Sequence, residues 1–340
     1  MVMKWSAILS VFLLTLACKQ PEEVLPIRPT FNTKCLIKRI YSSSNLEPNA
    51  AHQNETETLY DYDDKWSLKK VTTIGKIFSN STLTYRSETS ETFKYNENDL
   101  LTESIVEYGS TFLYRNAPEK VRVVISYKYA DSKLVEKKSK IEAFNYHGQG
   151  NELTETYQYT DGILSYYRRI LGTTQSEYAV KNGIIQNYQY GASSQYSFKY
   201  ELNKYGFISK FTSTELTNPP QTSIVTHEYD NLGRVIKVNT EAGEGLVSSE
   251  FFVYSYAPEP SSLIPKLKGH PDLPNPAGNG AAYNLKSSYV VRFNPKTGKE
   301  IATNYTKNYE FTLDPNGLVI ARKPIKFSEE SQFYEYVNCK

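Results

Sequence analysis

The chain has 340 residues and a formal net charge of +2, with 39 basic and 37 acidic residues. This near balance excludes a dedicated nucleic-acid binder, which needs a concentrated basic surface. Tyrosine is the compositional outlier, with 29 residues against 15 Phe and 2 Trp, and these aromatic residues suit half-buried β-strands.

Residues 1–17 have the features of a secretory signal peptide. Lys4 supplies a positive charge, and a short apolar run ends at Ala17, too short to span a bilayer as a helix. The sequence around Cys18 resembles the lipobox of bacterial lipoproteins. That resemblance implies cleavage between Ala17 and Cys18 and a diacylglycerol on the Cys18 thiol, so that the membrane itself is a partner of the protein.

Residues 18–34 are predicted to form the lipidated N-terminus and a flexible tether. The segment is polar and contains Pro21, Pro26 and Pro29, which suit an extended linker. Residue 19 is Lys, so the aspartate that retains some lipoproteins at the inner membrane is absent. We therefore expect a lipid-anchored protein of the outer membrane, on its periplasmic face or at the cell surface.

Two strands at the ends of the remaining chain are predicted to close it into a barrel. A single sheet with one apolar face must roll up or be covered in water. Residues 36–41 have the pattern of a first strand and residues 333–338 that of a last one. Pairing them would bring Cys35 and Cys339 together as a disulfide. Two alternatives stay open, namely a curved two-sheet or spiral arrangement and a pair of unrelated thiols.

A repeated pattern organises the chain between these ends. It consists of an aromatic, a polar and an aromatic residue, followed by a turn and a short aliphatic strand. Such alternation places rings on one face and polar groups on the other, as in a half-buried antiparallel strand. The copies are Tyr60-Asp61-Tyr62, Phe93-Lys94-Tyr95, Tyr127-Lys128-Tyr129, Tyr157-Gln158-Tyr159, Phe198-Lys199-Tyr200, His227-Glu228-Tyr229, Tyr309-Glu310-Phe311 and Tyr334-Glu335-Tyr336.

Turn residues separate the copies of the pattern. Asp161-Gly162 and Asn182-Gly183 are two-residue hairpin signals, and the segments 203–206, 230–233 and 314–317 are longer versions. Each unit is therefore predicted to be one β-hairpin. The fold class is predicted to be all-β, a long antiparallel meander of about 18 to 20 strands in a closed or nearly closed barrel. This single domain is predicted to cover residues 35–340.

The segment from His227 to Ile236 resembles the tyrosine-aspartate (YD) repeat of the large RHS proteins, and residues 309–322 are a looser copy. Most of the chain after Ala17 is similar to uncharacterised Gram-negative lipoproteins in which a lipobox precedes degenerate copies of this repeat. The domain of unknown function in those proteins has been described as porin-like. The resemblance implies a β-barrel fold and a location in the cell envelope, and it brings no catalytic residues with it.

Residues 257–280 interrupt the repeat with a proline-rich loop. Proline cannot donate a hydrogen bond to a sheet, so this segment is not a strand. We expect it to fold over one mouth of the barrel as a plug or binding loop, with Pro265, His270, Pro271 and Asp272 as candidate binding residues. The alternative is an inert excursion or hinge.

Catalytic and cofactor-binding motifs are not found. The 4 His residues are scattered, and no two cysteines stand at metal-ligand spacing. The paired acids Asp63-Asp64 and Glu329-Glu330 lie at expected turns, where a solvated role is usual. We expect no cofactor and no metal in a non-enzymatic envelope protein that binds a partner protein or glycan, and no nucleic acid. A glycan hydrolase and a purely structural envelope component are the alternatives.

Overall fold

The computed structural model describes most of the chain after the predicted tether. The described residues are 35–44, 52–112, 119–144, 152–172, 174–191, 195–217, 219–243, 245–325 and 330–339. The predicted signal peptide, Cys18 and the tether lie outside these residues, so cleavage and lipid attachment stay predictions.

Within the described residues, twenty β-strands and two short 3-10 helices follow one another. They are β1 (Leu36–Ser43), β2 (His52–Tyr62), β3 (Leu68–Ser79), β4 (Thr82–Tyr95), β5 (Leu101–Phe112), β6 (Glu119–Ala130), β7 (Lys133–Phe144), β8 (Leu153–Thr160), β9 (Ile163–Leu171), β10 (Thr174–Lys181), β11 (Ile184–Tyr190), β12 (Tyr196–Leu202), β13 (Ile208–Glu215), β14 (Gln221–Tyr229), β15 (Val235–Ala242), β16 (Gly245–Pro258), η1 (Pro260–Leu263), η2 (Gly280–Ala282), β17 (Tyr283–Phe293), β18 (Glu300–Leu313), β19 (Val319–Pro324) and β20 (Ser331–Val337).

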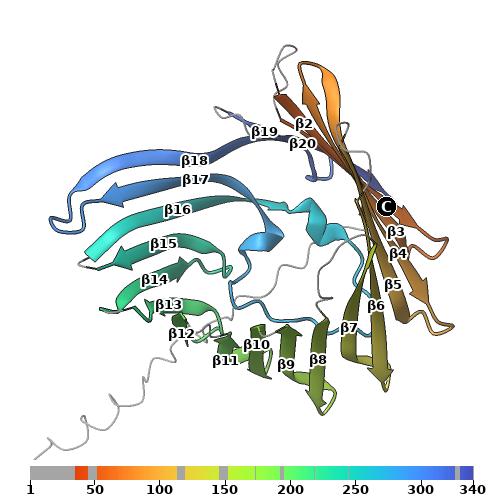
Figure 1. Ribbon diagram of the computed structural model, residues 1–340, viewed down its shortest axis with the longest axis horizontal. Coiled ribbons are helices and arrows are strands. Elements are labelled where there is room, and N and C mark those ends of the chain that lie inside the picture. The colour runs from red at the N-terminus through yellow and green to blue at the C-terminus, as the bar shows by residue number, and fades with distance from the viewer. Residues whose placement is uncertain are drawn as a thin grey trace, which may run out of the picture.

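The strands form one antiparallel meander that returns to its start (Figure 1). Each strand pairs with the next from β1 to β11 and again from β12 to β20. Strand β20 then pairs with β1, where Ile40 lies opposite Tyr334. The predicted all-β meander, its number of strands and its near closure are confirmed.

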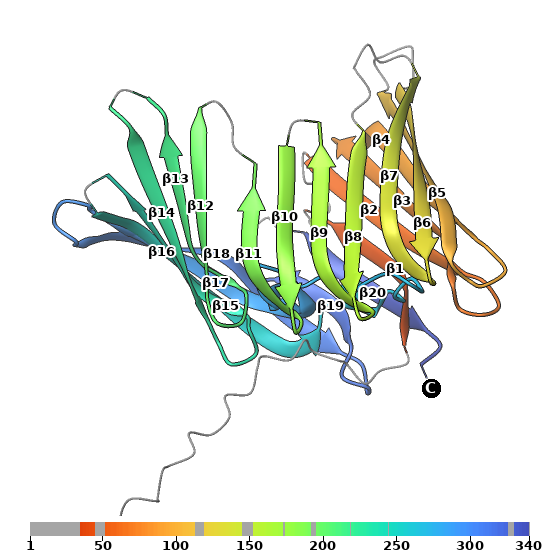
Figure 2. The ribbon, with the colours of Figure 1, turned by 90° about the horizontal axis from the view of Figure 1, so that it is seen from below.

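One gap remains in the ring of paired strands. Among the described residues no backbone ladder joins β11 to β12, and the two strands diverge in Figure 2. We call this gap the seam. It lies about half the ring away from the junction of β1 and β20, because eleven strands (β1 to β11) separate the two places on one side and nine (β12 to β20) on the other.

Turns of the repeat gather at one end of the barrel, which we call the capped rim. In the longer turns, the side-chain oxygen of an Asn or Asp accepts two backbone N–H groups of the turn. Asn203 Oδ1, for example, accepts the N–H of Tyr205 at 2.9 Å and that of Phe207 at 3.1 Å. The capped rim comprises the turns at 63–67, 96–100, 131–132, 161–162, 182–183, 203–206, 230–233 and 314–317.

The tyrosine that ends a repeat strand ties its hairpin to the preceding one. Its hydroxyl donates to a backbone carbonyl oxygen near the capped rim, as Tyr95 does to Leu68 at 2.7 Å and Tyr229 does to Ile208 at 2.8 Å. We call these residues latch tyrosines, and they explain why the repeat needs a ring with a polar tip. The latch tyrosines with a carbonyl partner are Tyr62, Tyr95, Tyr159, Tyr229 and Tyr336.

Candidate binding site at the capped rim

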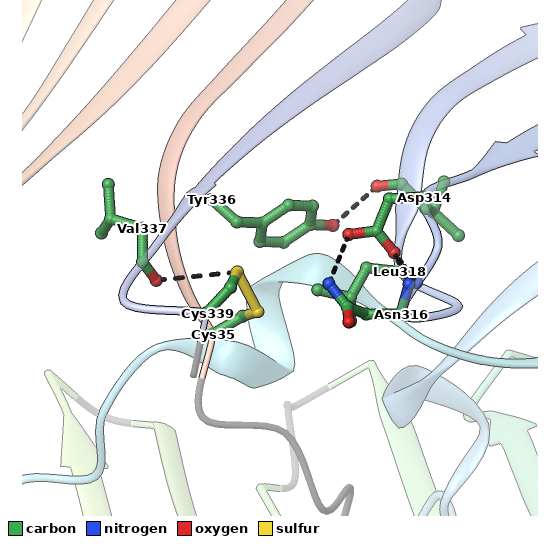
Figure 3. The surroundings of a disulfide bond; sticks show 8 residues. Cys35, Asp314, Asn316, Leu318, Tyr336, Val337 and Cys339 are labelled. Atoms are coloured by element: carbon green, nitrogen blue, oxygen red, sulfur yellow. Dashed lines mark hydrogen bonds between the residues drawn. A yellow bond between two sulfur atoms is a disulfide. The ribbon is translucent and has the colours of Figure 1, made fainter.

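Residues 259–282 leave β16, cross the capped rim and return to the sheet at β17 (Figure 1). We call this segment the crossing loop. Its first part, η1, places Leu263 in a buried cluster with Cys35 and Leu318. Cys35 and Cys339 are joined by a disulfide beside this cluster (Figure 3), which is the pairing that the sequence predicts.

The middle of the crossing loop is fixed to the hairpin of β6 and β7. The backbone N–H of Leu134 donates to Gly269 O at 2.9 Å, and the Tyr129 hydroxyl is hydrogen-bonded to His270 Nε2 at 2.9 Å. Gly269 has a positive φ of 78°, and a Cβ atom there would lie 2.5 Å from Ser132 O. Only glycine therefore fits this contact.

The last part of the crossing loop is fixed beyond the seam. The N–H of Ile208 donates to Pro276 O at 2.8 Å, and the N–H of Asn279 donates to Gly233 O at 2.6 Å. The side chain of Asn279 also donates through Nδ2 to Leu232 O at 2.9 Å. The crossing loop thus spans the capped rim from β1 to the β14–β15 turn, as expected of a segment that covers a barrel mouth. Its role in binding stays a prediction.

A polar cluster lies beneath the middle of the crossing loop. Glu155 is only 7% exposed; its carboxylate contacts Lys137 Nζ at 2.7 Å and accepts the Tyr167 hydroxyl at 2.7 Å. Burial lowers the pKa of His270 to about 4, with a smaller lowering from Lys137. Burial also raises the pKa of Tyr167 above its ordinary value. Neutral His270 and ion-paired Glu155 therefore serve as packing and anchoring groups at neutral pH.

Asp63, from the first of the two acidic pairs, lies at a turn and not in this cluster. Asp63 Oδ1 accepts the backbone N–H groups of Lys65 at 2.9 Å and Ser67 at 2.8 Å, so this carboxylate builds a turn. Glu329 lies outside the described residues. A glycan hydrolase needs two carboxylates that face each other. The described members of these two pairs do not supply such an arrangement.

Aromatic rings form a continuous row on the inner face of β8 to β13. The row passes through Tyr157, Tyr167, Tyr178, Tyr188, Tyr200 and Phe211, with ring centroids 5.4, 5.0, 6.3, 4.9 and 4.9 Å apart in that order. The contact between Tyr188 and Tyr200 crosses the seam. Side chains therefore connect the two strands that share no ladder.

A cavity of ≈ 260 Å³ lies where the crossing loop meets the two turns that flank the seam. We call it the seam pocket. Two turns and one loop supply its walls, so residues distant in sequence converge there. It is lined by Asn182, Gly183, Ile184, Tyr205, Gly206, Phe207, Asp272, Pro274, Asn275 and Asn279.

The four candidate residues of the loop have different positions in the structure. Asp272 lines the seam pocket, whereas His270 faces the barrel interior and is bound to Tyr129. Pro265 and Pro271 are half-buried within the loop. Sequence analysis missed the pocket residues Tyr205, Phe207, Asn275 and Asn279. The turn at 203–206 was recognised, but its contact with the loop has no signal in a single sequence.

The opposite face of the strands carries charged side chains in cross-strand ion pairs. Lys94 Nζ contacts Glu103 at 2.5 Å, and Lys94 lies between two inward-facing aromatic residues on β4. Arg122 contacts Glu142 at 2.9 Å, and Arg39 contacts both Glu57 at 2.7 Å and Glu335 at 3.0 Å. Exposed pairs of this kind add little stability individually, but they make the outer wall polar.

Similarity to known proteins gives little further information about this site. No protein-family model and no curated protein matches the chain. Among solved structures, the chain is similar to a porin-like protein from Bacteroides uniformis. The two are 14% identical, with 88% of this chain and 98% of that chain covered, at a TM-score of 0.35. A similarity this low carries no argument about function.

Membrane-spanning helices and metal-binding clusters are both absent from the described residues. None of the helices there is long and apolar enough to cross a membrane. The same part of the chain holds no group of three or more His, Cys, Asp or Glu side chains placed to bind a metal ion.

Proposed function

We propose that the protein is a lipid-anchored, non-enzymatic β-barrel of the outer membrane that binds a partner protein or a glycan at its capped rim. The seam pocket is the observation that carries this proposal. It joins side chains from two hairpin turns and the crossing loop in one cavity. Loops held by a rigid sheet are the usual place for binding residues.

The charged outer wall supports a barrel that stands in water. A barrel inserted in a bilayer presents an apolar band to the lipid, whereas Arg122, Lys94 and their carboxylate partners occupy the outer wall here. A lipid anchor is the complementary way to hold such a barrel at a membrane, and the lipobox-like sequence at Cys18 supplies one.

The anchor can be tested separately from binding. We expect the full chain, expressed in a Gram-negative host, to incorporate an alkyne-labelled fatty acid and to sediment with outer membranes. The Cys18→Ala variant should lose both properties, and Lys19→Ala, the matched control next to it, should keep the label. A Cys18→Ala variant that is still labelled and membrane-bound would contradict the proposed anchor.

Binding can be tested with the full chain in detergent. We expect the protein to retain a glycan on an array, or a cross-linked envelope protein, and substitution of Asp272 by Ala to weaken this retention. The control is Asp64→Ala, which changes an acidic residue at a turn outside the seam pocket. Equal retention by both variants and the unchanged protein would place binding away from the seam pocket, the observation that carries the proposal, and would contradict it.

A further inference from the structure

We infer that the seam pocket is a saccharide-binding site that takes the end of a neutral glycan. This inference rests on the proposed function and deepens it, because it selects one of the two partner classes and names the residues involved. Three properties of the pocket support it: its aromatic rings, its fixed donors and acceptors, and its charge.

Two rings contribute to the walls of the seam pocket. Tyr205 is half-buried and Phe207 is 8% exposed; their ring centroids lie 6.3 Å apart at an interplanar angle of 46°. A sugar ring has an apolar face of C–H groups, which packs against an aromatic face, while its hydroxyl groups point outward. Two aromatic rings tilted in this way can contact the C–H face and the edge of the same sugar ring.

Amide groups in the seam pocket are oriented by bonds to the backbone. Asn275 Oδ1 accepts the N–H of Ala277 at 2.9 Å, so its Nδ2 group is the donor end. Asn279 Nδ2 donates to Leu232 O at 2.9 Å, so its Oδ1 is the acceptor end. A sugar hydroxyl both donates and accepts hydrogen bonds. A fixed donor and a fixed acceptor beside aromatic rings therefore match neighbouring hydroxyl groups on one sugar.

The charge of the seam pocket favours a neutral ligand. Asp272 is the charged side chain among its described lining residues, and its Oδ1 contacts Lys266 Nζ at 2.6 Å. The described lining residues include no Arg or Lys of the kind that binds phosphate or sulfate groups. Asp272 and Lys266 form an ion pair and together carry no net charge, so the pair offers an anionic ligand no excess positive charge, whereas neutral hydroxyl groups can donate to the carboxylate.

The seam pocket is held in shape before any ligand arrives. The turn at 203–206 is fixed by Asn203, and the loop is bonded to Ile208 and Gly233 on the far side. Preformed sites lose less conformational entropy on binding. The volume of ≈ 260 Å³ lies at the small end of ligand sites, which suits one or two sugar rings at a chain end.

The test is calorimetric titration of the full chain in detergent with neutral hexasaccharides of glucose, xylose, mannose and N-acetylglucosamine, with inorganic phosphate as the anionic probe. We expect at least one neutral hexasaccharide to bind and phosphate not to bind. Tyr205→Ala and Asn275→Asp should each weaken binding on the order of tenfold. The second substitution keeps the oxygen that Ala277 uses and replaces only the donor. Circular dichroism and thermal unfolding verify that each variant is folded.

Tyr196→Ala is the matched control, because Tyr196 is a 36%-exposed ring outside the seam pocket. Unchanged affinity in this variant supports the inference. Loss of affinity in Tyr196→Ala, with none in the pocket variants, overturns the inference and leaves glycan binding elsewhere on the protein. Capture of a protein partner without any saccharide binding also overturns the inference but keeps the proposed function. If the protein binds neither a saccharide nor a protein partner, both the inference and the proposed function are overturned.

Discussion

The barrel is closed at two opposite places by different means. At the junction of β1 and β20, a backbone ladder runs from Leu36 opposite Val337 to Ser43 opposite Ser331, and the Cys35–Cys339 disulfide lies at its end (Figure 3). At the seam, rings, a close backbone approach and the crossing loop replace the ladder. Strand pairing and a covalent bond fix one junction, while side-chain packing fixes the other.

The position of the latch tyrosines is occupied differently at the seam. Tyr229 comes directly after a bulge and lies opposite Val235, and Leu202 lies opposite Ile208 in the same arrangement. Leu202 therefore occupies the position of a latch tyrosine at the seam, but it has no hydroxyl. It packs instead against the buried cluster that contains Ile185 and is joined by Leu273 of the crossing loop. Loss of the latch at the seam thus coincides with an apolar site for the loop.

Removing the disulfide should have the largest effect, and it tests the covalent junction. The bond spans a sequence separation of 304 residues, and the chain-entropy model gives up to about 5 kcal/mol for so long a loop. We expect the Cys35→Ser/Cys339→Ser variant to lose up to about that free energy of unfolding in urea. Reducing agent should then destabilise the parent protein but not the variant. Equal urea midpoints for the two proteins would mean that the ladder alone closes this junction.

Gly206→Ala tests the seam. Gly206 has a φ of 78°, and an added Cβ would lie 2.6 Å from the backbone N of Ile185, on the other side of the seam. We expect a loss of about 3 kcal/mol in the free energy of unfolding from strain and steric clash together.

Gly317→Ala is the matched control for this steric effect. Gly317 has the same φ of 78° in the equivalent turn, but no atom lies within 4 Å of its added Cβ. It should lose only about 1 kcal/mol from backbone strain. Equal losses for the two variants in urea unfolding would show that the approach of Gly206 to β11 does not hold the seam.

Acid should weaken the anchor of the crossing loop at His270. The folded-state pKa of about 4 is below the ordinary value near 6.5, so between these values the unfolded chain binds the extra proton. The free energy of unfolding therefore falls as the pH falls through this window. Because the ring is partly exposed, we expect about 1–2 kcal/mol. From pH 7 to pH 4.5, urea unfolding should show this additional loss in the parent protein relative to His270→Gln. If the free energy of unfolding falls equally with pH in the two proteins, the expected contribution of His270 is contradicted.

The smallest expected effect concerns a single latch. Tyr229→Phe removes the hydroxyl that donates to Ile208 O and should cost about 1 kcal/mol in unfolding free energy. Tyr200→Phe is a suitable control, because the Tyr200 ring packs on Phe211 with the ring centroids 4.9 Å apart. If Tyr229→Phe costs no more than the control, ring packing rather than the hydroxyl explains the repeated tyrosine.

The sequence predicted the features that depend on a local pattern of residues. It missed the features that arise where residues distant in the sequence come together. Alternating rings and Asn or Asp turns predicted the hairpins, and the end strands predicted the junction at Cys35 and Cys339. The seam was missed because Phe198-Lys199-Tyr200 has the same pattern as other copies, so no local signal in the sequence marks the absent ladder. The pocket was missed because Tyr205 and Asn275 meet only when the loop crosses the rim.

An even number of strands also determines where the chain enters and leaves the barrel. Cys35 and Cys339 both lie at the capped rim, so insertion or loss of a whole hairpin would leave the two ends at that rim. Ring size can therefore change in evolution by steps of two strands without disturbing the attachment point. A lipid on Cys18 would attach the barrel to the bilayer at this same rim, and residues 19–34 would allow a separation of up to about 55 Å.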